Sequence, residues 1–180
     1  MKNLITPLLL VFFATGLFAQ GLTLSSTDLQ GQITSAQVFS GFGCFGDNIS
    51  PQLAWQNAPE GTKSFAVTVY DPDAPTGSGW WHWVVFNIPV SVSELKTNAG
   101  NIETGLAPEG CTQSITSFGQ SGYGGACPPK GDKPHAYIFT VYALGIDKIE
   151  LEANAPPAMV GYYLNANVIE KASVISYYKQ

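Results

Sequence analysis

The chain contains no arginine, and only two histidines and three cysteines occur in its 180 residues. Its eight basic residues are all lysines, and thirteen acidic residues give it a formal net charge of −5. Proteins bind nucleic-acid backbones through clustered basic residues, so this charge balance predicts no nucleic-acid partner. Any anion that this chain binds must therefore be held by lysine, histidine or backbone N–H groups.

Charged residues are also scarce, at 12% of the chain, whereas 45% of residues are hydrophobic and 12% are aromatic. This composition excludes an intrinsically disordered chain, and the length suits one domain with a full core. Nineteen glycines and twelve prolines favour many turns between short strands over long helices.

The N-terminal segment 1–19 combines Lys2, an apolar run of about fifteen residues and a small residue, Ala19, at its end. That order is typical of a secretory signal peptide. The alternative is a membrane anchor, but the run is shorter than the roughly 18 residues of a spanning helix, and Pro7 interrupts it. We therefore expect a cleaved signal peptide, a single domain over residues 20–180, a periplasmic or secreted location, and no stable membrane anchor after cleavage.

Three segments are rich in the β-branched and aromatic residues that favour strands, namely residues 65–70, 83–88 and 136–144. The last two carry bulky residues on both alternating faces, as central strands covered on both sides do. Shorter candidate strands lie at residues 22–27, 33–38 and 52–55.

One helix is expected near the C-terminus. Asn154 can cap it, and Pro156 or Pro157 suits its first turn. Val160, Leu164 and Val168 then recur every four residues, which predicts an apolar stripe that docks onto the sheets. The sequence thus favours a mainly antiparallel β architecture with one or two peripheral helices.

Both histidines lie where a loop rich in glycine or proline leads into a predicted strand. His82 precedes the strand at residues 83–88, and His135 precedes the strand at residues 136–144. Side chains at strand ends point into the space between loops, where binding sites are commonly built. A lone histidine is more often a hydrogen-bonded structural residue, but two in the same context favour a site.

The third element is the loop Asp71-Pro-Asp-Ala-Pro75, directly after a predicted strand. Its carboxylates can simply stabilise the turn. Alternatively, Asp71 or Asp73 orients an imidazole through a ring N–H and favours its charged form, which would give a cationic anchor for phosphate. The nearby glycine-rich residues 121–125 would let backbone N–H groups approach an anion.

These segments resemble the two signature blocks of the phosphatidylethanolamine-binding protein family, in its bacterial Raf kinase inhibitor-like branch. The blocks are the Asp71–Pro75 loop followed by Trp-His-Trp around His82, and Pro-Pro-Lys-Gly at residues 128–131 followed by His135 and Tyr137. The resemblance runs from about residue 22 to residue 178. It implies two packed antiparallel sheets and a small surface cavity for phosphate, acetate or phosphorylated head groups. By position, the cavity residues are Asp71, His82, Pro129, His135 and Tyr137, with Asp73 close by.

The chain departs from the family at one position of the second block. It has His135-Ala136-Tyr137 where the family usually has His-Arg-Tyr. On an alternating strand Ala136 faces away from its two neighbours, so the cavity is expected to survive. Any ion pair made by the usual arginine is absent.

The leading expectation is an exported, non-catalytic protein that binds a small anion such as phosphate or phosphoethanolamine, with no cofactor and no metal. No Gly-x-Ser-x-Gly nucleophile motif occurs. One alternative is a hydrolase that uses His82, His135 and Asp71, with or without a metal ion. Another is a protein-interaction or inhibitor module with a vestigial cavity, in which the tryptophans at positions 80, 81 and 83 contact an unknown protein partner.

Export permits disulfides, and three cysteines allow one intrachain bridge. We expect Cys44 to pair with Cys127, because both lie in glycine-rich loops within the blocks that resemble the family. Cys111 would then be unpaired. A Cys44–Cys111 bridge would close a loop almost as long and is the second choice, and Cys111–Cys127 is the third.

Overall fold

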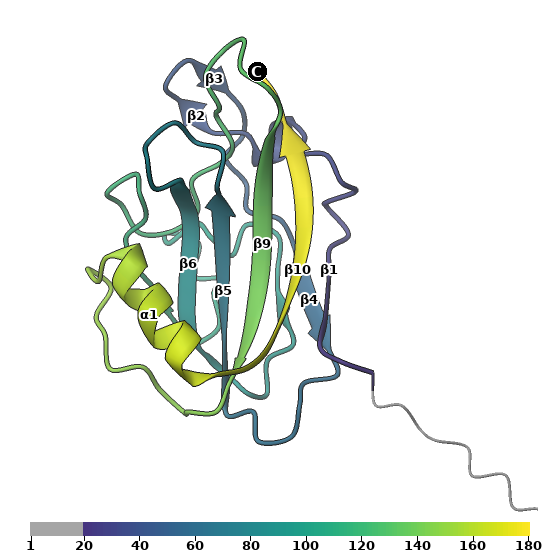
Figure 1. Cartoon of the computed structure of the whole chain (residues 1–180), viewed down its shortest axis with the longest axis vertical. Coiled ribbons are helices and arrows are strands. Elements are labelled where there is room, and N and C mark those ends of the chain that lie inside the picture. The colour runs from purple at the N-terminus through teal and green to yellow at the C-terminus, as the bar shows by residue number, and fades with distance from the viewer. Residues whose placement is uncertain (1–19) are drawn as a thin grey trace, which may run out of the picture.

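The structure is a computed structural model that describes residues 20–180, so the predicted signal peptide lies outside the described residues. Ten strands occur in the described chain, named in order β1 (Thr23–Ser25), β2 (Ser40–Gly41), β3 (Cys44–Phe45), β4 (Leu53–Gln56), β5 (Ser64–Asp71), β6 (Trp80–Pro89), β7 (Glu94–Leu95), β8 (Thr112–Gln113), β9 (His135–Leu144) and β10 (Val168–Tyr178). They form a five-stranded sheet in the order β10-β9-β5-β6-β8, a three-stranded sheet in the order β1-β4-β7, and a β2–β3 hairpin (Figure 1). Every pairing between these strands is antiparallel.

The centre of the larger sheet consists of β5, β6 and β9, which correspond to the three strongest strand predictions. Their β-branched and aromatic residues suit a pleated, buried surface. In the register of the sheet, Val67 of β5 lies between Val85 of β6 and Val141 of β9. The predicted architecture of packed antiparallel sheets is confirmed.

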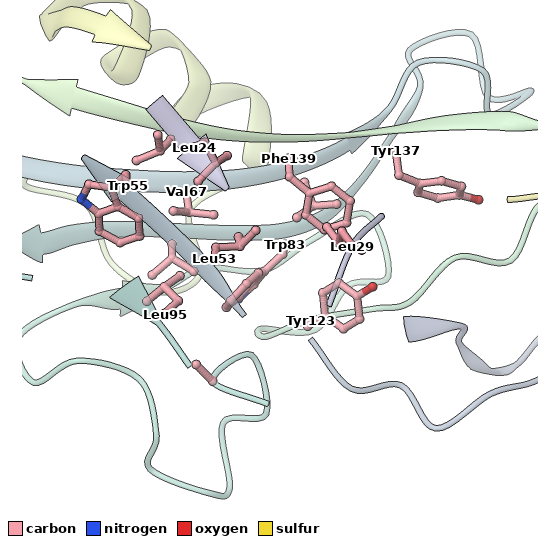
Figure 2. Packing of buried hydrophobic residues seen from close by; sticks show 14 of the residues in the cluster. Leu24, Leu29, Leu53, Trp55, Val67, Trp83, Leu95, Tyr123, Tyr137 and Phe139 are labelled. Carbon is pink, nitrogen blue, oxygen red and sulfur yellow. The ribbon is translucent and has the colours of Figure 1, made fainter. Parts of the chain in front are cut away.

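Alternate residues of the central strands face two different layers. Val67 and its same-face neighbours pack against the smaller sheet, including Trp55, in what we call the first core (Figure 2). The adjacent Ala66 instead faces a second core, which contains Val160 and Leu164 of the helix α1 (Pro157–Asn167). The larger sheet is therefore covered on both faces, as predicted for strands with bulky residues on both sides.

The helix near the C-terminus is present, but two of its predicted details are wrong. Its N-cap is Pro156 rather than Asn154, because Pro157 occupies the first helical position. The chain turns into β10 at Val168, so the buried stripe ends at Leu164. None of the helices within residues 20–180 is long and apolar enough to cross a membrane.

Two strand assignments also differ from the prediction. The candidate strand at residues 33–38 is instead a short 3-10 helix, η1 (Ser35–Gln37). The Gln37 side chain accepts hydrogen bonds from the backbone N–H and the hydroxyl of Thr34, and these local bonds favour a turn over a strand. In contrast, β10 was not predicted, since this edge strand alternates partly buried and exposed residues and has no apolar run.

Candidate functional site

The predicted site lies at one end of the larger sheet. Because neighbouring strands are antiparallel, the end of β5 at Asp71 lies beside the starts of β6 and β9. The loops that leave and enter these strands surround a cavity of about 170 Å³. Its lining residues are Phe42, Asp71, Ala74, Pro75, Thr76, Trp80, His82, Phe118, Cys127, Pro128, Pro129, His135 and Tyr137.

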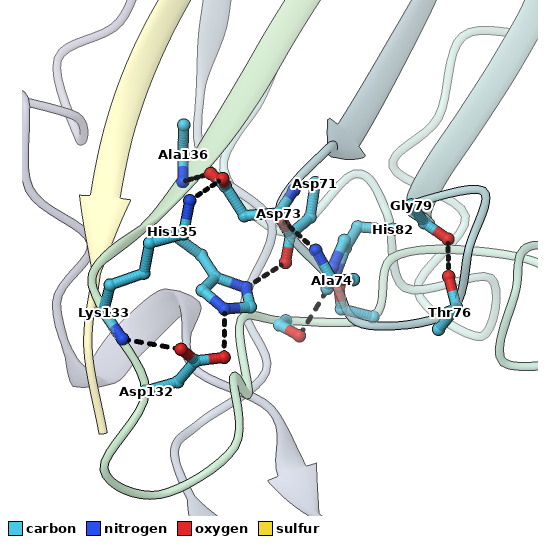
Figure 3. Close-up of polar contacts among 12 residues, drawn as sticks. Asp71, Asp73, Ala74, Thr76, Gly79, His82, Asp132, Lys133, His135 and Ala136 are labelled. Atoms are coloured by element: carbon cyan, nitrogen blue, oxygen red, sulfur yellow. Dashed lines mark hydrogen bonds and ion pairs between the residues drawn. The ribbon is translucent and has the colours of Figure 1, made fainter.

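Asp71 joins the two signature blocks (Figure 3). Its Oδ1 accepts hydrogen bonds from the backbone N–H groups of Asp73 at 2.8 Å and Ala74 at 3.1 Å, which holds the turn after β5. Its Oδ2 lies 2.8 Å from Nδ1 of His135, at the start of β9. Asp71 therefore has both of the roles considered for this loop, because it stabilises its own turn and also orients the imidazole of His135.

His135 is fully buried and has a second carboxylate partner. Its Nε2 lies 3.2 Å from Oδ2 of Asp132, three residues earlier in the chain. Burial alone would lower the pKa of His135, but the hydrogen bonds to Asp71 and Asp132 raise it above its ordinary value. With both ring nitrogens facing carboxylates, His135 is an imidazolium that has no N–H left for a ligand.

Asp73 lies beside the cavity and does not line it. Its Oδ1 accepts from the Lys133 ammonium and its Oδ2 accepts from the backbone N–H of Ala136 at 3.0 Å. The bond from Lys133 is the main reason why the pKa of Asp73 lies below its ordinary value. At the position where the family usually has arginine, Ala136 thus contributes only its backbone, and Lys133 supplies the cation that pairs with Asp73.

His82, the third residue of β6, has the opposite environment. Its Nδ1 lies 2.7 Å from the carbonyl oxygen of Gly124 and 3.1 Å from that of Gly125. Carbonyl oxygens only accept hydrogen bonds, so Nδ1 carries the hydrogen, and Nε2 has no partner within residues 20–180. Burial lowers the pKa of His82 to about 4, so its ring is neutral at pH 7.

Tyr137 follows two residues after His135 and points to the same side of β9. Its side chain is 1% exposed, and its hydroxyl has no hydrogen-bond partner within the described residues. Two other buried polar atoms share this condition there, on Trp55 and Ser176, but neither residue lines the cavity. An unpaired buried hydroxyl costs free energy, and this one belongs to a residue that lines the cavity and whose ring meets that of His82 edge-on.

An aromatic wall closes one side of the cavity. The ring of Phe42 stacks on that of Phe118 at 5.9 Å, and Trp80 meets Phe118 edge-on at 5.3 Å. Phe42 is 77% exposed at the tip of the β2–β3 hairpin, far from the signature blocks in sequence. Neither Phe42 nor Phe118 carries a motif, so the sequence prediction missed both.

The predicted Cys44–Cys127 disulfide is present and ties this hairpin to the cavity wall. The two α-carbons are 5.9 Å apart, and Cys111 is the free cysteine. Neither alternative pairing occurs. Since Cys127 lines the cavity, the bridge holds the hairpin against the loop that contains the second signature block.

Five of the six predicted site residues line the cavity, and Asp73 alone does not. The prediction missed Asp132, although its place three residues before His135 on a glycine-containing turn was an available signal. The tryptophans proposed as one contact surface lie apart, since Trp80 lines the cavity, Trp81 packs against the second core and Trp83 is buried in the first core. In the part of the chain that the structure describes, no group of three or more His, Cys, Asp or Glu residues is placed to hold a metal ion.

Comparisons with known proteins agree with these observations. A family model described as "Phosphatidylethanolamine-binding protein" matches residues 25–179. The chain is 51% identical over 181 residues to the UPF0098 protein YbcL of Escherichia coli strain K12, covering 99% of each chain. It is 50% identical over 153 residues to the UPF0098 protein YbhB of the same strain, covering 84% of this chain and 96% of YbhB. A crystal structure of E. coli YbcL, described as a new member of the mammalian PEBP family, has a TM-score of 0.87 at 53% identity and covers 89% of this chain and 99% of that chain.

Proposed function

Because the chain belongs to the phosphatidylethanolamine-binding protein family, we propose that it is an exported, non-catalytic protein whose cavity binds a small anion. The ligand class is phosphate or a phosphorylated head group such as phosphoethanolamine. The observation that carries this proposal is the unpaired hydroxyl of Tyr137, which is buried in the cavity wall. A ligand oxygen that accepts from this hydroxyl would remove the cost of leaving it unpaired.

The charge of His135 supports the same proposal. This buried imidazolium lies in the wall and offsets part of the negative charge of Asp71 and Asp132, which its N–H groups face, so an anion meets less repulsion there. The cavity volume of about 170 Å³ suits a small group rather than a whole lipid. The aromatic wall formed by Phe42, Phe118 and Trp80 would contact whatever apolar part the ligand carries.

The hydrolase alternative has less support. His135 is held by two carboxylates and is not free to exchange a proton with a substrate. The hydroxyl of Thr76, which lines the cavity, donates to the carbonyl of Gly79 at 2.6 Å, and the sulfur of Cys127 is in the disulfide. Incubation of the protein with phosphoethanolamine should therefore release no inorganic phosphate beyond the uncatalysed rate, and multiple turnovers would contradict the non-catalytic role.

Export is proposed from two features. Residues 1–19 have the order of a signal peptide, and the Cys44–Cys127 bridge suits an oxidising compartment. The alignment with YbcL includes this leading segment, since it covers 99% of the chain. We propose a periplasmic or secreted location for the cleaved protein.

The binding proposal is tested by titrating phosphate into the wild type and into Tyr137→Phe by calorimetry, in a buffer without other oxyanions. One hydrogen bond to a charged group is worth about 1.5–3 kcal/mol, so Tyr137→Phe should weaken phosphate binding about tenfold to a hundredfold. Its free energy of unfolding without ligand should rise by about 1 kcal/mol, because the variant no longer buries a hydroxyl that has no partner within the described residues.

Tyr123→Phe is the matched control. The Tyr123 hydroxyl is also buried, but it donates to the carbonyl of Gln37 at 3.0 Å and the residue does not line the cavity. This variant should lose about 1 kcal/mol of stability and keep its phosphate affinity. Absence of phosphate binding by the wild type at millimolar concentration would refute the proposal, as would equal affinities for the wild type and Tyr137→Phe.

A further inference from the structure

We infer that the cavity selects oxyanions that still carry a proton, and that His82 is the residue that makes this selection. The inference rests on the proposed anion binding and specifies its ligand class: a phosphate monoester in its singly protonated form is bound, whereas a sulfate ester or a phosphodiester is rejected. All three can have the same charge, so the discrimination depends on one O–H group.

The hydrogen-bonding pattern of His82 carries the inference. The carbonyl groups of Gly124 and Gly125 hold the hydrogen on Nδ1. The remaining nitrogen, Nε2, has no partner within residues 20–180 and belongs to a side chain that lines the cavity and is 4% exposed. In the neutral ring Nε2 can only accept a hydrogen bond. An oxygen without hydrogen would meet a lone pair there, whereas a P–O–H group would donate to it.

The charges around the cavity support the same conclusion. His135 and Lys133 are the cations of the cluster, and three carboxylates lie against them, on Asp71, Asp73 and Asp132. This cluster has a net charge of −1. A singly charged ligand is therefore favoured over a doubly charged one, and a phosphate monoester lowers its charge to −1 by keeping one proton.

Methyl phosphate and methyl sulfate are the matched probes. At pH 5 both are monoanions of similar size with one methyl group, and only methyl phosphate has an O–H. Methyl sulfate can form an equivalent complex only when His82 itself takes up a proton. The pKa of His82 is about 4, whereas the second pKa of a phosphate monoester is about 6.

These two values predict how the ratio of the affinities changes with pH. Methyl phosphate should bind about threefold tighter than methyl sulfate at pH 4.5, and the ratio should rise to about a hundredfold at pH 6.5. The charged groups that face His82 are Asp71 from β5 and His135 from β9, with Tyr137 in ring contact. Despite burial, the pKa of His135 is raised by its hydrogen bonds to Asp71 and Asp132, and the pKa values of Asp73 and Asp132 are lowered by theirs, so these shifts move all three titrations away from this pH range.

The experiment measures both affinities by calorimetry at pH 4.5, 5.5 and 6.5, with dimethyl phosphate as a third probe that has the same charge and no O–H. A rising ratio, with dimethyl phosphate as weak as methyl sulfate, supports the inference. Equal affinities for methyl phosphate and methyl sulfate at pH 6.5 would overturn it while leaving anion binding intact. If neither probe binds at any of these pH values, both the proposed function and the inference are wrong.

His82→Gln is the corresponding variant. Glutamine cannot take up a proton in this range, so methyl sulfate should no longer bind more tightly as the pH falls. If His82→Gln keeps the wild-type pH dependence, the proton taken up when methyl sulfate binds must go to another group. That result would overturn the role of His82. The comparison of probes on the wild type does not depend on whether this variant folds.

Discussion

Removal of the Cys44–Cys127 disulfide is expected to lower the free energy of unfolding by about 3–5 kcal/mol. The bridge joins positions 83 residues apart. A cross-link that closes a loop of this length restricts the unfolded chain by about 4.5 kcal/mol in the entropy model. Cys44 is also 4% exposed and belongs to the first core, so its replacement adds a small loss of packing. Residual compactness of the unfolded chain acts in the other direction.

The double variant Cys44→Ala/Cys127→Ala is compared with the wild type by urea unfolding, followed by tryptophan fluorescence. Without the cross-link the unfolded chain exposes more surface, so the slope of stability against urea should increase. In a thermal scan, the melting temperature should fall by about 6–20 °C, at about 2–4 °C for each kcal/mol in a domain of this size.

Cys111→Ala is the control for losing a thiol without losing a bridge. Cys111 is free and half-buried, so this variant should change stability by less than about 1 kcal/mol. A double variant within about 1 kcal/mol of the wild type would refute the entropy argument. A reductant that destabilises the double variant as much as the wild type would show that the bridge is not responsible.

Two further predictions concern the charge of His135 and the start of the exported chain. Because the folded pKa of His135 lies above its unfolded value, its contribution to stability is present below about pH 6.5 and is lost as the pH rises through the folded pKa. Asp132→Asn removes one of the two carboxylates, so the His135 ring should titrate at lower pH when followed by NMR. The loss of folding stability with rising pH should then begin at a lower pH. An unchanged titration would contradict the Asp132 contact. The intact mass of protein from the periplasm or medium of the native host should correspond to a chain that starts at or near Gln20, and retention of residues 1–19 would favour a membrane anchor instead.

The central strands and the cavity residues at their ends were predictable because their signals are local in sequence. The segments that became β5, β6 and β9 consist of β-branched and aromatic residues between turn residues, and such segments form strands wherever they are buried. Asp71, His82 and His135 lie at the ends of these strands, next to the loops. Antiparallel pairing then brings all three to the same end of the sheet.

Other elements were not predictable because their stability comes from partners elsewhere in the chain. The edge strand β10 pairs with β9 but has no apolar run of its own. Phe42 reaches the cavity because the disulfide ties its hairpin to the loop at Cys127. A pattern search along one segment cannot detect such contacts.

By itself, then, the sequence determined that two short motifs supply part of the cavity lining, including Asp71, His82 and His135. Only the tertiary structure decided what each side chain can do. Two carboxylates around His135 keep this ring charged. Burial keeps His82 neutral, and the carbonyl groups of Gly124 and Gly125 hold its hydrogen on Nδ1. The two histidines look alike in the sequence but differ in charge and in hydrogen-bonding capacity, because a proton's free energy depends on the surrounding charges and on solvation, which are set only when distant segments fold together.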